Sequence, residues 1–268
     1  MESAWPYRTA LVTGASSGIG AALAQELAQR GCDLVLVARS EERLQQRAET
    51  LRATHGHRVE VVATDLTKGA PGSRLASAVA KLGMEIDLLV NNAGFASSGS
   101  FAAIDARRER EEIALNATAV VDVSHAFLPD MLAAGRGAIL NMASLAAFQA
   151  VPYMTVYAAT KAFVLSFSTG LWAEVHDRGV HVMAVCPGPV NTPFFASSGQ
   201  KSPLDRLPGM LVLEADAVAR GSVEALLRKQ MVYTPGAANR LQQTISSPLV
   251  PRSLMARVAA RMLKHEVG

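Results

Sequence analysis

Short apolar runs rich in β-branched residues alternate along the chain with longer helical stretches, and this alternation restricts the possible folds more than any other feature. The runs are apolar at consecutive positions instead of at every second one, so both faces of each strand should be covered. Strands joined by helices through right-handed crossovers form a doubly wound α/β domain. We therefore expect a parallel sheet of about seven strands with helices on both faces. The expected strands are 10–13, 34–37, 59–63, 86–90, 138–142, 180–185 and 231–233, and the expected helices include 19–29, 41–50, 75–82, about 102–127 and 215–227.

We expect the 268 residues to form a single domain. Half of them are hydrophobic and 18% are charged, so a chain of this length can bury a large core, which excludes a mainly disordered protein. Residues from about 193 to 214 mix glycine and proline with apolar side chains, as either a substrate lid or an ordinary surface connection would. Residues from about 235 to 268 form a C-terminal extension.

The charge and composition exclude several classes of protein. A net charge of +3 with dispersed basic residues does not suit a nucleic-acid-binding protein, which concentrates Lys and Arg on one face. The two cysteines lie far apart and the six histidines show no ligand spacing, so no metal site is expected. No apolar stretch of about 18 residues is free of charge, and no N-terminal targeting segment is evident. These features predict a cytoplasmic protein without a transmembrane segment.

The first expected strand runs directly into a glycine-rich turn, which is followed by a helix. Gly14, Gly18 and Gly20 let the backbone turn tightly and approach a pyrophosphate, while the N-terminus of the helix presents free N–H groups to an anion. Such a turn can also simply join a strand to a helix. Its place after the first strand of a βαβ unit favours dinucleotide binding. The full segment is Thr13-Gly14-Ala15-Ser16-Ser17-Gly18-Ile19-Gly20.

The residues at the end of the second strand indicate which nucleotide the chain prefers. An acidic side chain there would accept hydrogen bonds from the adenosine ribose 2′-hydroxyl, but this chain has Ala38 and then Arg39. The Arg39 guanidinium could pair with a 2′-phosphate through charge-assisted hydrogen bonds. The alternative is a solvated surface charge. The sequence therefore predicts NADP(H) in preference to NAD(H).

Tyr157 and Lys161 lie four residues apart in an expected helix, so their side chains share one face. A nearby ammonium favours the phenolate, so Lys161 is expected to lower the tyrosine pKa from about 10 toward neutrality. A phenol tuned in this way can pass a proton to or from an alcohol oxygen. A Tyr-x-x-x-Lys spacing alone is often structural. Ser144, however, ends a strand thirteen residues earlier, at the sheet edge where α/β proteins bind ligands, and its hydroxyl could hold a carbonyl oxygen.

Five motifs follow one another in order along the chain. They are the glycine turn, Asn91-Asn92-Ala93-Gly94, Ser144, Tyr157-x-x-x-Lys161 and Pro187-Gly188-Pro189-Val190-Asn191-Thr192. With this combination the sequence resembles the short-chain dehydrogenase/reductase family, in its single-domain branch, over roughly residues 7 to 192. The resemblance implies a Rossmann-type fold and a nicotinamide cofactor.

The resemblance also implies a role for each matching residue. Tyr157 would donate and accept the proton, Ser144 would orient the substrate oxygen, and Lys161 would lower the tyrosine pKa while holding the nicotinamide ribose. Asn116 would support a proton-relay water; the alternative is an amide that kinks or packs the helix. Asp65 would contact the adenine. The cofactor-binding residues implied are Gly14, Ser16, Ser17, Gly18, Ile19, Gly20, Arg39, Asp65, Asn92, Ala93, Gly94, Tyr157, Lys161, Pro187, Gly188, Val190 and Thr192.

We expect an NADP(H)-dependent oxidoreductase that interconverts a carbonyl and a secondary alcohol. Apolar residues such as Phe148, Phe194 and Met210 favour a hydrophobic ketone or 3-oxoacyl-type substrate. A non-catalytic nucleotide-binding sensor or scaffold, or a sugar or polyol dehydrogenase, is the alternative. The resemblance favours a homodimer or homotetramer built on the helices near 102–127 and 157–177. The apolar and basic C-terminal tail could pack as a terminal helix or touch a membrane surface.

Overall fold

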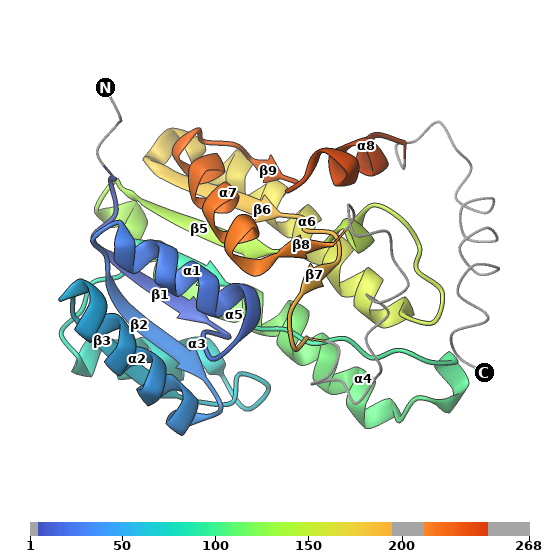
Figure 1. The fold of residues 1–268 in the computed structure, drawn as a ribbon, viewed down its shortest axis with the longest axis horizontal. Coiled ribbons are helices and arrows are strands. Elements are labelled where there is room, and N and C mark those ends of the chain that lie inside the picture. Colours follow the sequence, from blue (N-terminus) through green and yellow to red (C-terminus); the bar gives the residue numbers. More distant parts are fainter. Residues whose placement is uncertain (1–4, 195–211, 246–268) are drawn as a thin grey trace.

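A seven-stranded parallel sheet forms the centre of the computed structural model, which describes residues 5–194 and 212–245. The strand order is β3-β2-β1-β4-β5-β6-β9 (Figure 1), which confirms the predicted doubly wound fold. Each neighbouring pair in this sheet is parallel, as helical crossovers require. The strands are β1 (Thr9–Thr13), β2 (Asp33–Ala38), β3 (Val59–Ala63), β4 (Leu88–Asn91), β5 (Gly137–Met142), β6 (Val180–Val185) and β9 (Val232–Tyr233).

Helices cover both faces of the sheet. Figure 1 shows α1, α2 and α7 in front of the strands, with α3 and α5 behind them. The helices are α1 (Gly18–Gln29), α2 (Glu41–His55), α3 (Pro71–Lys81), α4 (Ala106–Ile113), α5 (Ala119–Ala133), α6 (Thr155–Val175), α7 (Ala215–Leu227) and α8 (Ala237–Ile245). The predicted helix at 215–227 is confirmed as α7, and the predicted strand at 231–233 as β9.

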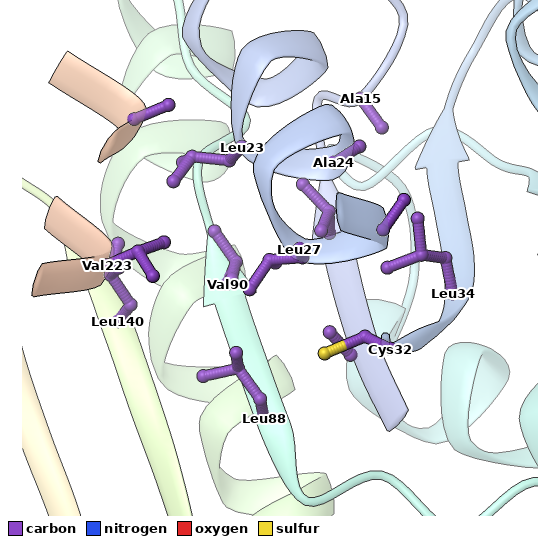
Figure 2. Packing of buried hydrophobic residues seen from close by; sticks show 14 of the residues in the cluster. Ala15, Leu23, Ala24, Leu27, Cys32, Leu34, Leu88, Val90, Leu140 and Val223 are labelled. Atoms are coloured by element: carbon purple, nitrogen blue, oxygen red, sulfur yellow. The ribbon is translucent and has the colours of Figure 1, made fainter. Parts of the chain in front are cut away.

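Most of the core lies in two apolar layers, one on each face of the sheet, and a smaller third cluster lies around Val164 of α6 and Ala184 of β6. Figure 2 shows the first layer, where Leu23 and Leu27 of α1 pack with Leu34, Val90 and Val223. The second layer joins α3 and α5 to the opposite face of the same strands. All six residues of β5 and all six of β6 are buried. The continuous apolar runs of the sequence are therefore strands that are covered on both faces.

The predicted helix from about 102 to 127 is confirmed as a continuous helical stretch, but it runs from 106 to 133 and contains a π-helical turn that was not predicted. The structure has a 3₁₀ turn (Phe101–Ala103), then α4, a π-helical turn (Ala114–Thr118) and α5. The Asp105 carboxylate accepts a hydrogen bond from the N–H of Arg107 (2.9 Å) and caps the start of α4. The π-helical turn contains Asn116, whose side-chain amide bonds outside the helix, and such turns often occur at functional sites.

The predicted lid and C-terminal extension are described only in part. Residues 195–211 of the lid and 246–268 of the extension lie outside the described residues. The strands β7 (Val190–Asn191) and β8 (Leu213–Glu214) pair in parallel. The residues just before the predicted lid therefore lie beside the last residues of the lid. Among the helices of the described ranges, none has both the length and the apolarity needed to span a bilayer. The same ranges contain no group of three or more His, Cys, Asp or Glu side chains that could hold a metal ion.

Candidate active site

The strand order reverses between β1 and β4, which are neighbours in the sheet although β2 and β3 separate them in the sequence. At such a point the carboxyl ends of the strands border a crevice, which is the usual ligand site of an open α/β sheet. The predicted motifs collect at this edge. The glycine turn follows β1, residues 92–94 follow β4, Ser144 follows β5, and residues 187–192 follow β6.

The glycine turn lies in close contact with two of these loops. Gly14 and Gly18 have positive φ angles of 70° and 56°, in the left-handed region that suits glycine. A Cβ at Gly14 would lie 2.7 Å from Asn92 Nδ2 and 2.9 Å from the Cα of Ala93. A Cβ at Gly18 would lie 3.3 Å from Thr192. The turn therefore meets the loop after β4 and the loop after β6.

Thr13 ties the loop after β4 to the glycine turn. Its hydroxyl oxygen accepts hydrogen bonds from the N–H groups of Asn92 (2.9 Å) and Ala93 (3.0 Å). Asn92 Nδ2 in turn donates to the Thr13 carbonyl (2.9 Å). Asn92 thus holds the loop after β4 against the glycine turn by hydrogen bonds to Thr13. Its contact with the nucleotide stays a prediction.

The N-terminus of α1 suits the phosphates of a dinucleotide. The helix begins at Gly18, the side chain of Ser17 makes no capping hydrogen bond, and the first turn carries no acidic residue. Free N–H groups and the positive end of the helix dipole favour an anion at this place. A Cβ at Gly20 would clash with the carbonyl of Gly14 and the Asn92 amide, so the tight cradle needs its glycines. These residues fit a nicotinamide dinucleotide.

Arg39 and Asp65 lie together at the end of the sheet that the adenosine half would occupy. Arg39 is exposed directly after β2. Burial would raise the pKa of Asp65, but hydrogen bonds from Thr67 and the positive charges of Arg39 and Lys68 outweigh it and lower the pKa. Asp65 Oδ1 accepts from the N–H (2.9 Å) and the hydroxyl (2.8 Å) of Thr67. Asp65 therefore holds its own turn, and its predicted contact with adenine stays a prediction.

Ser144 is held between the ends of β5 and β6. It precedes a 3₁₀ turn (Leu145–Ala147), and its Oγ accepts from the N–H of Ala146 (3.1 Å) and donates to the carbonyl of Pro187 (3.5 Å). The backbone makes the same link, because the N–H of Leu145 donates to that carbonyl (2.9 Å). The half-buried hydroxyl therefore has a fixed position at the crevice.

Tyr157 and Lys161 occupy the first two turns of α6. Lys161 Nζ lies 5.7 Å from the centre of the Tyr157 ring. Lys161 is 4% exposed, and its ammonium donates to the carbonyl of Met142 (2.7 Å), the last residue of β5. A Cβ at Gly94 would lie 3.6 Å from the same Nζ. The structure thus brings Tyr157, Lys161 and Ser144 to one end of the sheet.

The protein's own groups raise the pKa of Tyr157, whereas the sequence predicted a lowered value. Burial raises the pKa of Tyr157 to about 12, hydrogen bonding with Ser144 offsets this only in part, and the charge of Glu112 raises it further. Burial also lowers the pKa of Lys161 to about 8, although Glu112 and Cys186 act in the opposite direction. Among the described groups the pKa of Tyr157 is therefore raised, mainly by burial, and is not lowered toward neutrality by Lys161 as predicted.

Asn116 is fully buried in the π-helical turn and connects two other segments. Its Nδ2 donates to the carbonyl of Phe95 (2.8 Å) and to Thr160 Oγ1 (3.2 Å), and its Oδ1 accepts from the N–H of Phe95 (3.1 Å). The amide therefore packs the helix junction, which was the alternative to a relay role. Support of a relay water by Asn116 stays a prediction.

Glu112 is a residue near the site that sequence reasoning missed. It is fully buried in the last turn of α4, and its charge acts on both Tyr157 and Lys161. The available signal was its position four residues before Asn116, which places both side chains on one helical face. A highly charged helix hides that signal, because most of its acidic residues are solvated.

Asn239 of α8 is a second missed residue. It is 1% exposed, and a Cβ at Gly188 would lie 2.6 Å from its Oδ1. Its Nδ2 donates to the carbonyl of Pro235 (3.0 Å). The C-terminal extension therefore packs against the loop after β6, a contact that no local pattern in the sequence indicates.

Hydride transfer needs a dinucleotide cradle and a proton donor side by side, and this fold presents both at one edge of its sheet. That combination defines a class, the nicotinamide-dependent oxidoreductases. The comparison with protein families agrees, since the family model described as short chain dehydrogenase matches residues 8–203. The chain belongs to the short-chain dehydrogenase/reductase family, as its motifs predicted, and is an oxidoreductase that acts on CH–OH or carbonyl groups.

Individual relatives support this membership. The chain is 32% identical over 229 residues to 17-beta-hydroxysteroid dehydrogenase type 3 of Danio rerio, which covers 84% of this chain and 71% of the relative. It is 36% identical over 182 residues to very-long-chain 3-oxoacyl-CoA reductase-A of the same organism, which covers 66% of this chain and 56% of the relative. The solved structure of a short-chain dehydrogenase from Sphingobium yanoikuyae in complex with NADPH is 35% identical, with a TM-score of 0.79 over 97% of this chain and 95% of that one.

Proposed function

We propose that this chain reduces and re-forms a carbonyl group with NADP(H), and that its substrate is a hydrophobic ketone or a 3-oxoacyl-type compound. The observation that carries the proposal is the meeting of Ser144, Tyr157 and Lys161 beside the glycine cradle. A nucleotide-binding sensor or scaffold would have no chemical need for all three groups, which is why we favour an enzyme.

The proposed chemistry divides between the nucleotide and the chain. When bound, the nicotinamide supplies or accepts the hydride at the substrate carbon. Tyr157 donates a proton to the carbonyl oxygen during reduction and takes it back during oxidation. The Ser144 hydroxyl donates a hydrogen bond to the same oxygen, where negative charge grows in the transition state. Lys161, held on the Met142 carbonyl, places a positive charge beside the phenol.

The raised pKa of Tyr157 suits the reducing direction. A phenol whose burial raises the pKa to about 12 keeps its proton at neutral pH and is ready to donate it. Oxidation would first require the loss of that proton.

The preference for NADP(H) is supported by Arg39. It is an exposed guanidinium at the end of β2, directly after Ala38, where an NAD-specific protein would place an acidic side chain. The Sphingobium structure, which is named as a complex with NADPH, is in line with this assignment. The nucleotide itself is a nicotinamide cofactor for the whole family.

The apolar substrate class is supported by the surroundings of Tyr157. The ring of Phe194 lies 5.9 Å from the Tyr157 ring at an angle of 60°, on the loop after β6. The two Danio rerio relatives are named for steroid and very-long-chain 3-oxoacyl-CoA substrates. A sugar or polyol, the alternative, would need polar partners at the place where this aromatic pair lies.

The test is NADPH oxidation against a panel of steroid ketones, aliphatic ketones, 3-oxoacyl thioesters and sugars, with nucleotide binding measured by fluorescence in parallel. We expect turnover with the hydrophobic carbonyls. Tyr157→Phe, which removes only the phenol oxygen, should lower kcat about 10²- to 10⁴-fold and leave NADPH binding unchanged. Tyr7→Phe removes a phenol oxygen before β1, far from the crevice, and should keep wild-type turnover.

Three other outcomes of this test would each contradict a different part of the proposal. Wild-type turnover in Tyr157→Phe would remove this tyrosine from its proposed role. Binding without turnover across the whole panel would favour the sensor or scaffold. Turnover confined to the sugars would reject the hydrophobic substrate class and keep the oxidoreductase.

A further inference from the structure

Glu112 is an acidic side chain that the fold buries completely. It lies in α4 with an exposure of 0%. Its Oε2 accepts a hydrogen bond from the N–H of Ser97 (2.8 Å), whereas its Oε1 has no hydrogen-bond partner among the described residues. Desolvation makes a buried carboxylate costly, so such a group calls for an explanation.

The loop of residues 94–97 connects Glu112 with the active-site lysine. Lys161 Nζ lies beside Gly94 at one end of this loop, and Glu112 holds the N–H of Ser97 at the other. The helices α4 and α6, which carry the two charged residues, pack against each other. A buried carboxylate and a buried ammonium therefore share one protein interior, where solvent screens them little.

The charge of Glu112 reaches both groups that the proposed reaction uses. Burial lowers the pKa of Lys161, and the Glu112 carboxylate is the largest influence in the opposite direction, followed by the Cys186 thiol. Burial raises the pKa of Tyr157, and Glu112 raises it further. Both effects favour the protonated form of the group concerned.

The ionisation of Glu112 itself depends on several neighbours. Burial raises its pKa to about 7, and Glu109 on the same helix also raises it. Ser97 and the guanidinium of Arg108 act in the opposite direction. Arg108 also lies over the ring of Phe95, 4.8 Å from its centre, so its charge is fixed next to the loop.

We propose that Glu112 is a positioning residue of this active site, a buried counter-charge that keeps Lys161 charged and Tyr157 protonated and so sets the upper pH limit of ketone reduction. The inference rests on the proposed function, because it takes Tyr157 and Lys161 as the proton-transfer groups. Its rival is a purely structural role in which Glu112 only anchors the loop at Ser97.

Removal of the Glu112 charge should move the pH profile of kcat/KM to lower pH and not to higher pH. Without the carboxylate, the pKa values of Lys161 and Tyr157 both fall. Reduction needs the charge on the first and the proton on the second, so the alkaline limb of kcat/KM moves to lower pH, by about one unit for a nearby charge. A loop anchor would lower kcat/KM at every pH and leave the limb in place.

The experiment compares three variants of the full chain in NADPH-dependent ketone reduction across pH. Glu112→Gln removes the charge and keeps an oxygen that can accept from Ser97. Glu112→Asp keeps the carboxylate on a side chain that is one methylene shorter. The alkaline limb of its kcat/KM profile should lie between those of the wild type and Glu112→Gln. Glu111→Gln removes the same charge from the neighbouring, half-buried position and should leave the limb unchanged.

Stability against pH provides a readout that needs neither nucleotide nor turnover. The pKa of Glu112 rises on folding from 4.5 to about 7, so the folded state holds this proton more tightly than the unfolded chain. Stability is then full below about pH 4.5 and falls as the pH rises through 7. Glu112→Gln should flatten this fall in the urea midpoint, and Glu111→Gln should not.

The outcomes separate this inference from the proposed function. If the wild type shows no turnover with any carbonyl, the proposed function fails, while the stability measurement still tests the burial of Glu112. If the wild type turns over and Glu112→Gln loses activity with its alkaline limb unmoved, the counter-charge role is overturned and the loop anchor is established. If Glu112→Gln does not fold, the urea midpoint of the wild type decides: a midpoint that does not fall as the pH rises from about 4.5 to 7 would contradict a buried carboxylate with a raised pKa and would overturn the proposal.

Discussion

In the proposed function, the choice between NADP(H) and NAD(H) depends on one exposed side chain, Arg39. The residue follows the last position of β2, and its charge is close enough to Asp65 to lower the pKa of that carboxyl group. An exposed guanidinium contributes little through solvent-screened ion pairs. Its contacts gain strength when a phosphate dianion accepts directed, charge-assisted hydrogen bonds. The selectivity of Arg39 should therefore appear only with a nucleotide that carries the 2′-phosphate.

We expect Arg39→Ala to weaken NADPH binding by about 10- to 100-fold, since hydrogen bonds to charged groups contribute about 1.5–3 kcal/mol. NADH binding should change little. Fluorescence titration with both nucleotides measures the two constants, and Arg43→Ala, which removes an exposed charge from α2, is the matched control. Equal weakening with both nucleotides would show that Arg39 does not read the 2′-phosphate.

The sequence predicted that Ser144, Tyr157 and Lys161 lie together, but it did not predict the raised pKa of the phenol. The spacing of Tyr157 and Lys161 on one helical face follows from helical geometry, and the placement of Ser144 follows from the strand it ends. The pKa of the phenol depends instead on burial and on Glu112, which is 45 positions away from Tyr157 in the chain. Contacts at that separation are made by the fold and leave no local pattern.

At the scale of the elements, the junction between α4 and α5 connects the segments that carry the candidate active site. The π-helical turn there places Asn116 where its amide binds the backbone of Phe95 in the loop after β4. The same amide donates to Thr160, which lies next to Lys161 in α6. One side chain thus joins the junction between α4 and α5, the loop after β4 and the helix α6.

Asn116→Ala should both destabilise the chain and lower its activity. It leaves the N–H and C=O of Phe95 without their partner, at a cost of about 1–3 kcal/mol for each buried group left unsatisfied. Urea denaturation measures the loss of stability and steady-state kinetics the loss of kcat. Thr118→Ala, at an exposed position in the same turn, is the control. A variant as stable as the wild type would show that these hydrogen bonds do not hold the junction.

The sheet was predictable to within a few residues at each strand end, because strands covered on both faces are continuously apolar. The helical stretch around 102–127 was also predicted, but the π-helical turn within it was not. The contact made from this turn, between Asn116 and Phe95, joins positions 21 residues apart. Helical periodicity reports only on neighbours within a few turns, so it cannot show where a π-helical turn lies in the helix.

At the scale of the whole molecule, two apolar layers share one set of strands. In β1, Ala10 and Val12 face the first layer and Leu11 faces the second. Both layers pack on the same strands, so the loss of either layer removes support from the strands that the other layer needs. The described part of the chain should therefore unfold as one cooperative unit, as compact domains commonly do.

Truncation in either layer tests this cooperativity. Leu27 in the first layer and Leu75 in the second are each 1% exposed, so Leu27→Ala and Leu75→Ala should each cost about 2–5 kcal/mol. Leu241→Ala, at a side chain that is 62% exposed, should change the free energy of unfolding by less than about 0.5 kcal/mol.

The two tryptophans report on the two layers separately, because Trp5 packs against the first and Trp172 against the second. Urea unfolding of Trp5→Phe and Trp172→Phe backgrounds therefore follows each layer by fluorescence. We expect either truncation to lower the midpoint seen by both tryptophans equally, with the slope m unchanged. If Leu27→Ala lowered the midpoint at Trp5 and left that at Trp172 in place, the layers would unfold independently, and a shared sheet would not be what makes this chain one domain.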